Sequence, residues 1–272
     1  MKMKPLKIAA LLLALALIIG LGIFANALVG NPISKMLAER TAEKYLSENF
    51  PDTDFYIESV GFSFKDGSYY AHIDSPGSMD SYFSLCITMG GALKYDTYDS
   101  VIDGSNTARR LNSAYRELAD TVLESTSFPY PSEIAFGDLA FTSREYLGLP
   151  DVPPYALIED ELVLDKLYDI PSLGAEAGHL VIYVDDDTVS PERASEIMLD
   201  IKRLMDEGGV PFYAMDFVLR HPRAEPDGSR PEGSIHVLDF PSADIYEEDM
   251  VSRVTAADAD ARAYYAALDA EK

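Results

Sequence analysis

Histidine is the side chain best suited to acid–base or metal chemistry near neutral pH, and the chain has four of them. They are His72, His179, His221 and His236. No two stand at a metal-ligand spacing such as i, i+4 on a helix, so a zinc or iron site would need distant residues to converge. His179 opens a predicted strand and His236 lies within one, where hydrogen-bonded histidines are common. The histidine spacing therefore predicts no transition-metal site.

Nucleophilic catalysis has no recognisable motif in this chain. A serine nucleophile on a sharp strand-to-helix turn would show Gly-x-Ser-x-Gly, which does not occur. The single cysteine, Cys86, excludes an intramolecular disulfide and a multi-cysteine zinc site. It falls within a predicted strand, on the face opposite Phe83, Leu85 and Ile87. We expect it to be a small, inert side chain.

The run Asp185-Asp186-Asp187 follows a predicted strand directly, with Thr188 and Glu192 just beyond it. Carboxylate oxygens in a loop are ligands that Ca²⁺ prefers. The run nevertheless lacks the alternation of ligand positions that an EF-hand loop uses to aim its oxygens at one point. Acidic residues before a helix also interact favourably with the helix dipole. We favour this second interpretation and keep calcium binding as an alternative.

Aspartates and tyrosines also occur together at the end of the first predicted sheet. Asp96, Asp99 and Asp103 stand among Tyr95 and Tyr98, a mixture of carboxylates and aromatics found in carbohydrate sites. In so acidic a chain such pairs are expected by chance. Five tyrosines concentrate on this sheet and its exit: Tyr69, Tyr70, Tyr82, Tyr95 and Tyr98. They form either an exposed partner surface or a packed layer with hydroxyls in water.

The charge of the chain limits its partners. Among 272 residues the net charge is −24, and only Lys2, Lys4 and Lys7 are charged before Lys35. The remainder carries 19 basic and 46 acidic residues, a net charge of −27. So negative a surface excludes nucleic acid bound through its phosphates and favours cationic partners. The alternative is that the acidity only keeps an exported domain soluble.

The N-terminal segment predicts a membrane anchor. An apolar run from Ile8 to Val29 follows the three lysines and is interrupted only by Asn26. About 22 residues are enough to cross a hydrocarbon core as a helix, and the lysines predict a cytoplasmic N-terminus with the remainder outside. Ala25-Asn26-Ala27 also fits a signal-peptidase site. We favour an uncleaved anchor, because the run exceeds the usual length of a signal peptide's apolar region.

Beyond the anchor, the periodicity predicts an α+β fold in two parts. A helix from Ser34 to about Asn49 precedes an antiparallel meander with a bulge near Glu58-Ser59 and a hairpin turn at Asp66-Gly67. The meander's strands are predicted at residues 55–64, 69–73, 83–89 and 92–95. A second helix starts near Asn106 as its N-cap and is followed by a strand at residues 134–141.

The proline-rich stretch Leu149–Pro154 is the best predicted domain boundary. The predicted organisation is an anchor at residues 1–30, a first α+β domain at 31–148, a linker at 149–154 and a second α+β domain at 155–272. In the second domain we expect strands at 162–167, 179–184, 212–220 and 234–240. A short helical turn is expected at 171–177, a longer helix from Ser190-Pro191 and a final helix from Ser242. The strand at 179–184 is nearly all apolar, so it should lie inside the sheet.

Several short motifs follow the apolar run: Gly30-Asn31-Pro32-Ile33-Ser34-Lys35, then Tyr45-Leu46, Phe50-Pro51-Asp52, Ser75-Pro76 and Arg109-Arg110-Leu111. In the C-terminal half Gly178-His179-Leu180 and residues 210–218 stand out in the same way. In these motifs the sequence resembles the YfjL-like group of membrane-anchored proteins of Gram-positive bacteria. The resemblance implies an N-terminal anchor and two α+β domains, with no assigned activity.

These observations predict a membrane-anchored extracytoplasmic protein that is not an enzyme. We predict no catalytic, cofactor-binding or metal-ligating residues, and no cofactor. The expected partners are the cytoplasmic membrane, through the N-terminal helix, and an envelope protein, a peptide or a wall component. Two alternatives remain. One is an extracellular hydrolase built from dispersed Asp, Glu and His, and its best case requires His179, His236 and Asp185–Asp187 to lie close together. The other is a calcium-stabilised scaffold.

Overall fold

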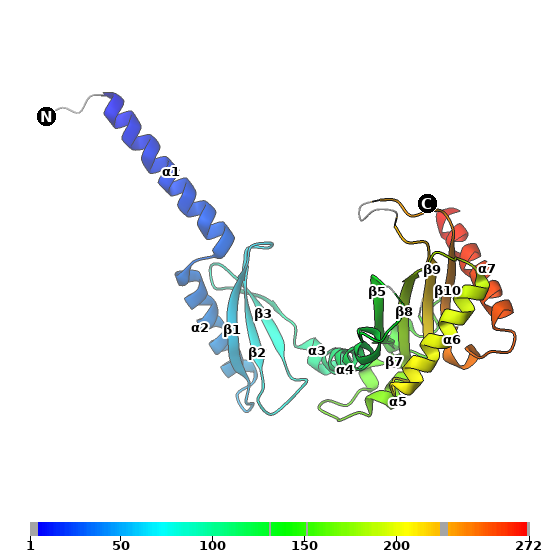
Figure 1. Ribbon diagram of the computed structural model, residues 1–272. Coiled ribbons are helices and arrows are strands. Elements are labelled where there is room, and N and C mark those ends of the chain that lie inside the picture. The colour runs from blue at the N-terminus through cyan, green and yellow to red at the C-terminus, as the bar shows by residue number, and fades with distance from the viewer. Residues whose placement is uncertain (1–4, 131, 151, 224–227, 271–272) are drawn as a thin grey trace. The chain divides into compact units, whose positions relative to one another are not determined.

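The computed structural model describes residues 5–130, 132–150, 152–223 and 228–270. The chain folds into two compact units, Met1–Asn106 and Thr107–Lys272 (Figure 1). The predicted α+β class is confirmed, with a long apolar N-terminal helix and sheets made mainly of antiparallel strands.

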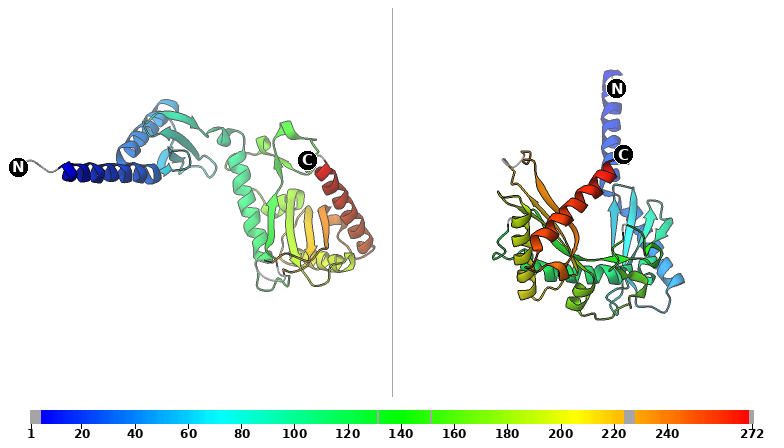
Figure 2. Two further views of the ribbon diagram at one scale, coloured as in Figure 1. Left: turned by 90° about the horizontal axis from the view of Figure 1, so that it is seen from above. Right: turned by 90° about the vertical axis from the view of Figure 1, so that its right-hand side faces the viewer.

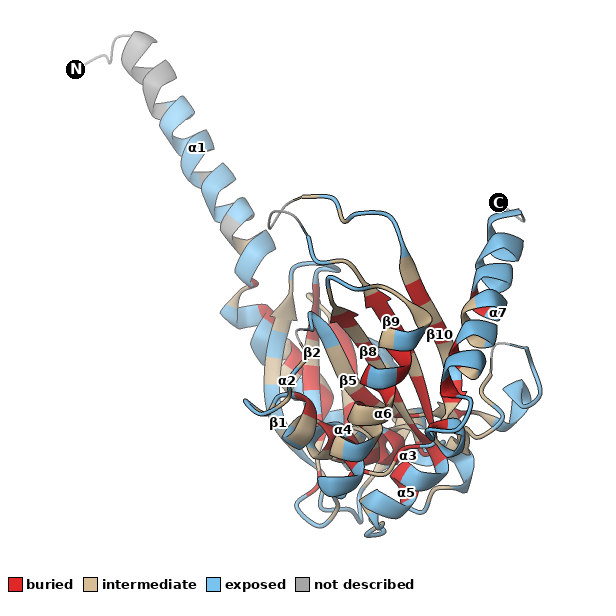
Figure 3. Cartoon of the chain, turned by 45° about the vertical axis from the view of Figure 1, so that its right-hand side comes forward, coloured by how far each residue is buried: buried red, intermediate tan, exposed pale blue. Residues whose placement is uncertain are grey.

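Helix α1, Pro5–Val29, contains the predicted apolar segment. Its 25 residues extend about 37 Å, which exceeds a hydrocarbon core of about 30 Å. By length and composition α1 could cross a membrane. Its described side chains are exposed except for Asn26 (Figure 3). Lys2 and Lys4 lie outside the described residues, as does the side chain of Lys7, and the cleavage site after Ala27 stays a prediction.

The first unit is a helix on an antiparallel meander, as predicted. Helix α2, Pro32–Asn49, packs on one face of a four-stranded sheet in the order β1-β2-β3-β4. The strands are β1 Tyr56–Ser63, β2 Ser68–Asp74, β3 Phe83–Thr88 and β4 Leu93–Asp96, followed by the short helix α3 Asp99–Ile102. The predicted bulge is confirmed, because the β1–β2 register shifts between Ile57 and Ser59.

The core of the first unit follows the alternation of its strands. Tyr69, Ala71 and Ile73 of β2 are buried beside Ala38 and Ala42 of α2, where the small alanines let the helix approach the sheet closely. Tyr70 and His72 alternate with them on the opposite face. At one end of the core Phe50, Phe55, Phe83 and Tyr98 pack with ring centroids 4.6–6.2 Å apart.

The second unit is a mixed sheet in the order β10-β9-β8-β5. Its strands are β5 Ile134–Leu139, β8 Gly178–Asp185, β9 Ala214–Arg220 and β10 Ser234–Pro241, with a small separate pair of β6 Phe141–Thr142 and β7 Leu157–Ile158. Strands β8 and β9 are parallel and are joined through helix α6, Pro191–Glu207, while β5 and β10 are antiparallel to their neighbours. The predicted interior position of β8 is confirmed.

Helices cover one face of this second sheet. Leu180, Ile182 and Val184 of β8 point into a core that also contains residues of α4 Ser105–Leu123, α5 Ile170–Ala177, α6 and α7 Met250–Ala270. Tyr115 of α4 is fully buried there and donates its hydroxyl hydrogen to the Pro211 carbonyl oxygen at 3.0 Å. The predicted start of α6 is confirmed: Ser190 caps the helix and Pro191 is its first residue.

A helix lies along each edge of the second sheet, α4 beside β5 and α7 beside β10 (Figure 2). On β5, the amide of Leu139 donates to Oδ1 of Asn112 in α4 at 2.7 Å. On β10, the amide of His236 donates to Oδ1 of Asp258 in α7 at 2.9 Å. Edge amides that are occupied in this way cannot pair with a strand from another chain.

Several predicted boundaries are wrong. The chain divides between Asn106 and Thr107 rather than at Leu149–Pro154, because β5 pairs with β8 along its whole length and so belongs to the second unit. Residues 162–167 form no strand, and the final helix α7 starts at Met250 after a short turn at Ser242–Asp244. Asn106 is not an N-cap; its side-chain amide donates to the carbonyl oxygens of Asp80 and Tyr82.

The packing around Tyr115 generates a prediction for stability. A Cβ atom on Gly178 would overlap the Tyr115 hydroxyl and lie 2.5 Å from the Gly174 carbonyl oxygen. Gly178→Ala should therefore lower the free energy of unfolding by about 1–3 kcal/mol through overpacking. Urea unfolding of the full chain in detergent, with hydrogen exchange of β8 peptides, measures this loss. Gly61→Ala is the control, because no atom lies within 4 Å of its added Cβ; equal stability of the two variants would contradict the prediction.

Candidate functional site

The Asp185–Asp187 run is engaged with arginines. Oδ1 of Asp185 accepts from Arg220 Nε and lies 2.8 Å from a guanidinium nitrogen of Arg230. Burial raises the pKa of Asp185, but the two guanidinium groups outweigh it and the pKa lies below its ordinary value. Asp186 accepts from Arg193 in the first turn of α6 and from the amide of Thr188. These two carboxylates are thus used within the fold, which leaves the calcium alternative without its main ligands.

The histidines do not converge. His72 hydrogen-bonds Ser84, and the Nε2 atom of His236 lies 2.7 Å from the Ser234 hydroxyl while its ring packs against Tyr265. His179 and Asp185 stand at opposite ends of β8, about 20 Å apart along the strand. The arrangement that gave the hydrolase alternative its best case is therefore absent among the described residues.

The other candidates have local roles. Cys86 is fully buried in β3 on the face predicted for it. Asp96 accepts from the Tyr45 hydroxyl and the Tyr98 amide, and burial together with this carboxylate raises the pKa of Tyr45 to about 12. Asp103 accepts from the amide of Ser105. Asp96 and Asp103 thus stabilise local structure of the first unit, and no arrangement of the described residues supports a carbohydrate site there.

The tyrosines of the first sheet divide between its faces, as the alternation predicts. Tyr69 is buried under α2 and Tyr98 joins the aromatic cluster. On the other face the hydroxyls of Tyr70 and Tyr95 lie 3.2 Å apart, and Tyr70 donates to Asp66. Tyr95 is half exposed. The five residues therefore do not form a single aromatic surface.

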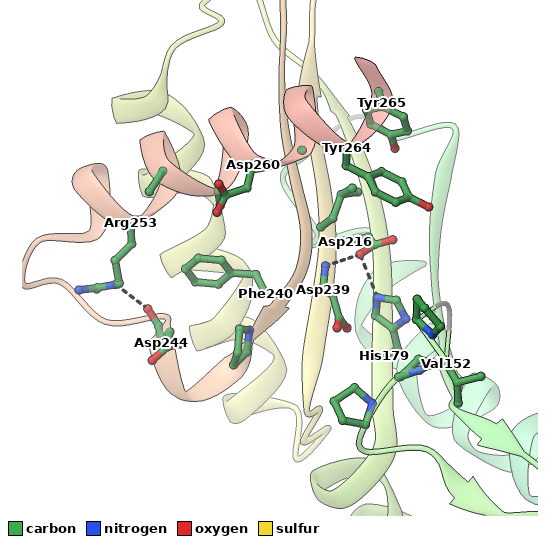
Figure 4. Close-up of a pocket in the computed structure, with 18 residues that line it drawn as sticks. Val152, His179, Asp216, Asp239, Phe240, Asp244, Arg253, Asp260, Tyr264 and Tyr265 are labelled. Atoms are coloured by element: carbon green, nitrogen blue, oxygen red, sulfur yellow. Dashed lines mark hydrogen bonds and ion pairs between the residues drawn. The ribbon is translucent and has the colours of Figure 1, made fainter. Parts of the chain in front are cut away.

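A cleft of about 830 Å³ lies on the second unit, on the sheet face that the core helices leave uncovered (Figure 4). One wall is the segment Pro150–Pro154, of which Asp151 is outside the described residues. The other wall is the C-terminal half of α7, with Tyr264 and Tyr265. The floor comes from β8, β9 and β10: His179, Asp216, Leu238 and Asp239.

His179 and Asp216 form a pair on adjacent strands at the floor of the cleft. His179 Nε2 is buried and lies 3.2 Å from Oδ1 of Asp216, but off the direction of a good hydrogen bond. Burial lowers the pKa of His179, yet the carboxylates of Asp216, Asp239 and Asp138 outweigh it, so its pKa lies above its ordinary value. The same Asp216 oxygen accepts from the amide of Asp239 at 2.6 Å.

Asp239 occupies an unusual backbone position. It has a φ of +50°, in the left-handed region, and the β9–β10 register is disrupted between Val237 and Phe240. Such bulges turn side chains away from the regular alternation of a strand and are common beside functional sites. Here the carboxylate of Asp239 accepts from the Tyr155 hydroxyl, and the Tyr155 ring stacks on Tyr213 with centroids 4.3 Å apart.

The cleft is negatively charged. Four aspartates line it, namely Asp216, Asp239, Asp244 and Asp260, and within the described part of the chain no lysine or arginine forms an ion pair with them. Arg253 also lines the cleft, but it stacks on the Tyr246 ring and donates to the carbonyl oxygens of Asp244 and Tyr246. Metal binding has no support there, because no group of three potential ligands occurs among the described residues.

The sequence contains signals for this cleft that the motif spacings considered above do not include. Asp216 interrupts the otherwise apolar strand 212–218, and a charged residue inside a buried strand is informative. Asp239 stands between Leu238 and Phe240 in the same way. The spacing between histidines can only indicate whether His179 shares a metal with another histidine. It cannot reveal Asp216, the carboxylate beside His179 on the neighbouring strand. The proline-rich segment, predicted to be a linker, forms a wall of the cleft.

Comparison with known proteins gives matches over most of the chain. A family model described as the YfjL-like N-terminal domain matches residues 5–98, and one described as the YfjL-like C-terminal domain matches residues 114–255. No curated protein matches. A crystal structure of a DUF5037 family protein from Ruminococcus gnavus is 14% identical, and the alignment covers 67% of this chain and 74% of that chain. Its TM-score is 0.20, so this similarity carries no argument.

The pair of His179 and Asp216 generates a prediction about pH. Since the pKa of His179 is raised in the folded state, its protonation stabilises the fold below about pH 6.5, and that contribution is lost as the pH rises through the folded pKa. The wild-type protein should therefore be more stable than His179→Gln at pH 6, by up to about 1 kcal/mol, and lose this advantage by pH 9. Urea unfolding with hydrogen exchange of β8 peptides at both pH values measures it.

The control for this prediction is the same comparison in an Asp216→Asn background. Removing the nearest carboxylate should reduce the pH-dependent difference, while Asp239 and Asp138 retain part of it. A wild-type advantage that grows from pH 6 to pH 9 would contradict the assigned direction.

Proposed function

The chain belongs to the YfjL-like family, and from that premise we propose that it is a membrane-anchored binding protein of the cell envelope, with a cleft for cationic peptide segments. Family membership gives the two-domain organisation and no activity. Support for the anchor comes from α1, and support for the ligand comes from the cleft.

The support for anchoring is the character of α1. The helix is long enough for the hydrocarbon core, and its described side chains other than Asn26 are exposed. Lys2 and Lys4 precede the helix and Lys7 lies in its first turn, before the apolar run, which favours a cytoplasmic N-terminus. The remainder of the chain, with a net charge of −27, would then lie outside the cell.

The cleft of the second unit is the single observation that carries the binding proposal. Its four aspartates give a negative potential that favours positively charged ligands. Prolines, Leu238 and the rings of Tyr264 and Tyr265 provide apolar surface beside these carboxylates. Lysine and arginine side chains have this same combination, an apolar stem and a charged end, and the charged end also interacts with tyrosine rings.

The size of the cleft suits a short peptide segment better than a folded surface. Its volume of about 830 Å³ falls within the range of roughly 300–1,000 Å³ typical of pockets that bury small ligands. A segment of a few residues with one or two lysines would place its charges near Asp216 and Asp239. A basic peptide from an envelope protein or a cross-linking peptide of the wall has this chemistry.

A hydrolase is the second candidate, because His179, Asp216 and Asp239 meet in one cleft. General acid–base catalysis uses such groups when they reach a substrate. The described residues that line the cleft include no Ser, Thr or Cys, so a covalent route would need a nucleophile from elsewhere. Oδ1 of Asp216 is already engaged by the Asp239 amide and His179, which favours binding over proton transfer.

Anchoring predicts a defined topology in intact cells. Cys86 is buried and can be replaced by serine, leaving a chain in which a single new cysteine reports on location. Asp187→Cys, at an exposed position of the second unit, should react with a membrane-impermeant maleimide in intact cells. Met3→Cys should react only after the membrane is permeabilised. Equal protection of both cysteines in intact cells would contradict the proposed orientation.

If the cleft binds cationic peptides, the affinity should depend on the carboxylates of Asp216 and Asp239. A fluorescent pentapeptide with lysines at its second and fourth positions should bind the full chain in detergent, and its analogue with glutamines should not. The double variant Asp216→Asn/Asp239→Asn should weaken binding about tenfold, which corresponds to about 1.4 kcal/mol. Asparagine retains the size of both side chains and tolerates the positive φ at position 239. Fluorescence anisotropy measures the affinity.

The matched control changes the net charge equally at exposed positions elsewhere. Asp52→Asn/Asp187→Asn should bind the lysine peptide as the wild type does. If this control loses as much affinity as the cleft variant, binding reflects overall charge and the cleft is not the site. Mass spectrometry of the recovered peptide should show it intact; cleavage that disappears in Asp216→Asn would favour the hydrolase instead.

A further inference from the structure

The junction between α1 and α2 is built without a flexible linker. Gly30 ends α1 with a φ of +70°, and Asn31 directly caps α2, its side chain accepting from the Ser34 amide at 2.8 Å. The same side chain donates to Oδ1 of Asn26 in the last turn of α1 at 2.8 Å. Pro32 is the first residue of α2. The two helices are therefore joined through a single hydrogen-bonded turn.

Tyr69 fastens this turn to the sheet. Its hydroxyl accepts from the Asn31 amide at 2.7 Å and donates to the Asn31 carbonyl oxygen at 2.8 Å. The Tyr69 ring is buried and packs against Phe62, with centroids 5.1 Å apart. A Cβ atom at Gly30 would overlap the Tyr69 hydroxyl and lie 2.8 Å from Phe62, so only glycine fits. The end of α1 is fixed against β1 and β2.

This attachment places the β1–β2 hairpin beside the end of α1 (Figure 1). Phe62 and Tyr69 are cross-strand partners one pair away from the hairpin turn, which Ser63 and Gly67 close with a 2.9 Å backbone hydrogen bond. Phe64 in the turn lies about 7 Å farther along the chain than Phe62. It is 63% exposed, although it is a large apolar residue next to Lys65.

Two more exposed apolar side chains adjoin the junction. Val29, the last residue of α1, is 75% exposed, and Ile33 in the first turn of α2 is 68% exposed. If α1 crosses the membrane, its C-terminal end lies at the headgroup layer. The β1–β2 hairpin is fixed beside that end, so its tip must contact the same layer. Aromatic and lysine side chains are the residues that favour the membrane–water interface.

We propose that the hairpin tip Phe64-Lys65, together with Val29 and Ile33, is a docking surface for the lipid headgroup layer. The inference rests on the proposed anchoring by α1. The apolar side chains would enter the boundary between headgroups and acyl chains, and Lys65 would lie near lipid phosphates. The first unit is then held against the bilayer in one orientation, because Tyr69 prevents it from swinging about the turn.

The absence of tryptophan from the chain allows a test with single-tryptophan variants. Phe64→Trp probes the hairpin tip, and Tyr56→Trp probes the opposite end of β1, about 23 Å away. Both positions are exposed, so neither substitution disturbs the core. Leu17→Trp, within α1, reports on anchoring itself. Each full-length variant is reconstituted into phosphatidylcholine–phosphatidylglycerol vesicles with or without brominated acyl chains, which quench tryptophan on contact.

The expected result is that brominated lipids quench Leu17→Trp most and Phe64→Trp several-fold more than Tyr56→Trp. Phe64→Trp should also emit at a shorter wavelength than Tyr56→Trp. If Leu17→Trp is quenched but Phe64→Trp behaves like Tyr56→Trp, the docking surface is refuted and the anchor stands. If Leu17→Trp escapes quenching, the anchor and the docking surface are both refuted.

Discussion

Each four-stranded sheet of this protein buries only one of its faces under helices, and this constraint decides the roles of the residues along every strand. Successive side chains of a strand point to opposite faces, so each buried residue has a neighbour that must be accommodated outside the helix-covered core. In β2, Tyr69 is buried under α2, so its neighbour Tyr70 lies on the opposite face. In β8, Leu180 is buried in the core of the second unit, so its neighbour His179 lies outside that core. In the second unit, α4 and α7 also each occupy one amide of an edge strand. The cleft forms on the sheet face that the core helices leave uncovered.

The alternation also explains why the cleft needs a backbone irregularity. Val237 is buried in the core and Phe240 is buried as well, a spacing of three that a regular strand cannot produce. The bulge between them, with Asp239 in the left-handed region, returns Phe240 to the core and leaves the Asp239 carboxylate in the cleft. The cost of this conformation, of the order of 1–3 kcal/mol, is offset by the hydrogen bond from the Asp239 amide to Asp216 and by that from Tyr155 to the carboxylate.

Local sequence signals predict local structure well here and long-range pairing poorly. The bulge near Glu58-Ser59, the hairpin at Asp66-Gly67 and the cap at Ser190-Pro191 depend on neighbouring residues, and all three are confirmed. The pairing of β5 with β8 joins residues 39 to 49 positions apart, from Leu139 with Gly178 to Ile134 with Tyr183, and no local pattern records such a pairing. The predicted boundary at Leu149–Pro154 is therefore wrong. The cleft escapes prediction for the same reason: His179, Asp216 and Asp239 come from three strands, and the acidic composition conceals which carboxylates meet.

The fate of individual carboxylates shows why net charge alone cannot locate a site. In the sequence, Asp185 and Asp186 are stronger candidates for a ligand site than Asp216 and Asp239, because they are adjacent and precede a helix. Arg193, Arg220 and Arg230 neutralise them, and the pKa values of both aspartates are lowered. Asp239 instead receives its hydrogen bond from the neutral Tyr155, and Asp216 receives one from a backbone amide beside the partly buried His179. Hydrogen bonds from neutral donors satisfy the geometry of a carboxylate without cancelling its charge, and among the described residues only His179, beside Asp216, forms an ion pair with an aspartate of the cleft. Negative potential therefore persists in the cleft and is cancelled at the aspartate run, and a cationic ligand would be drawn to the former.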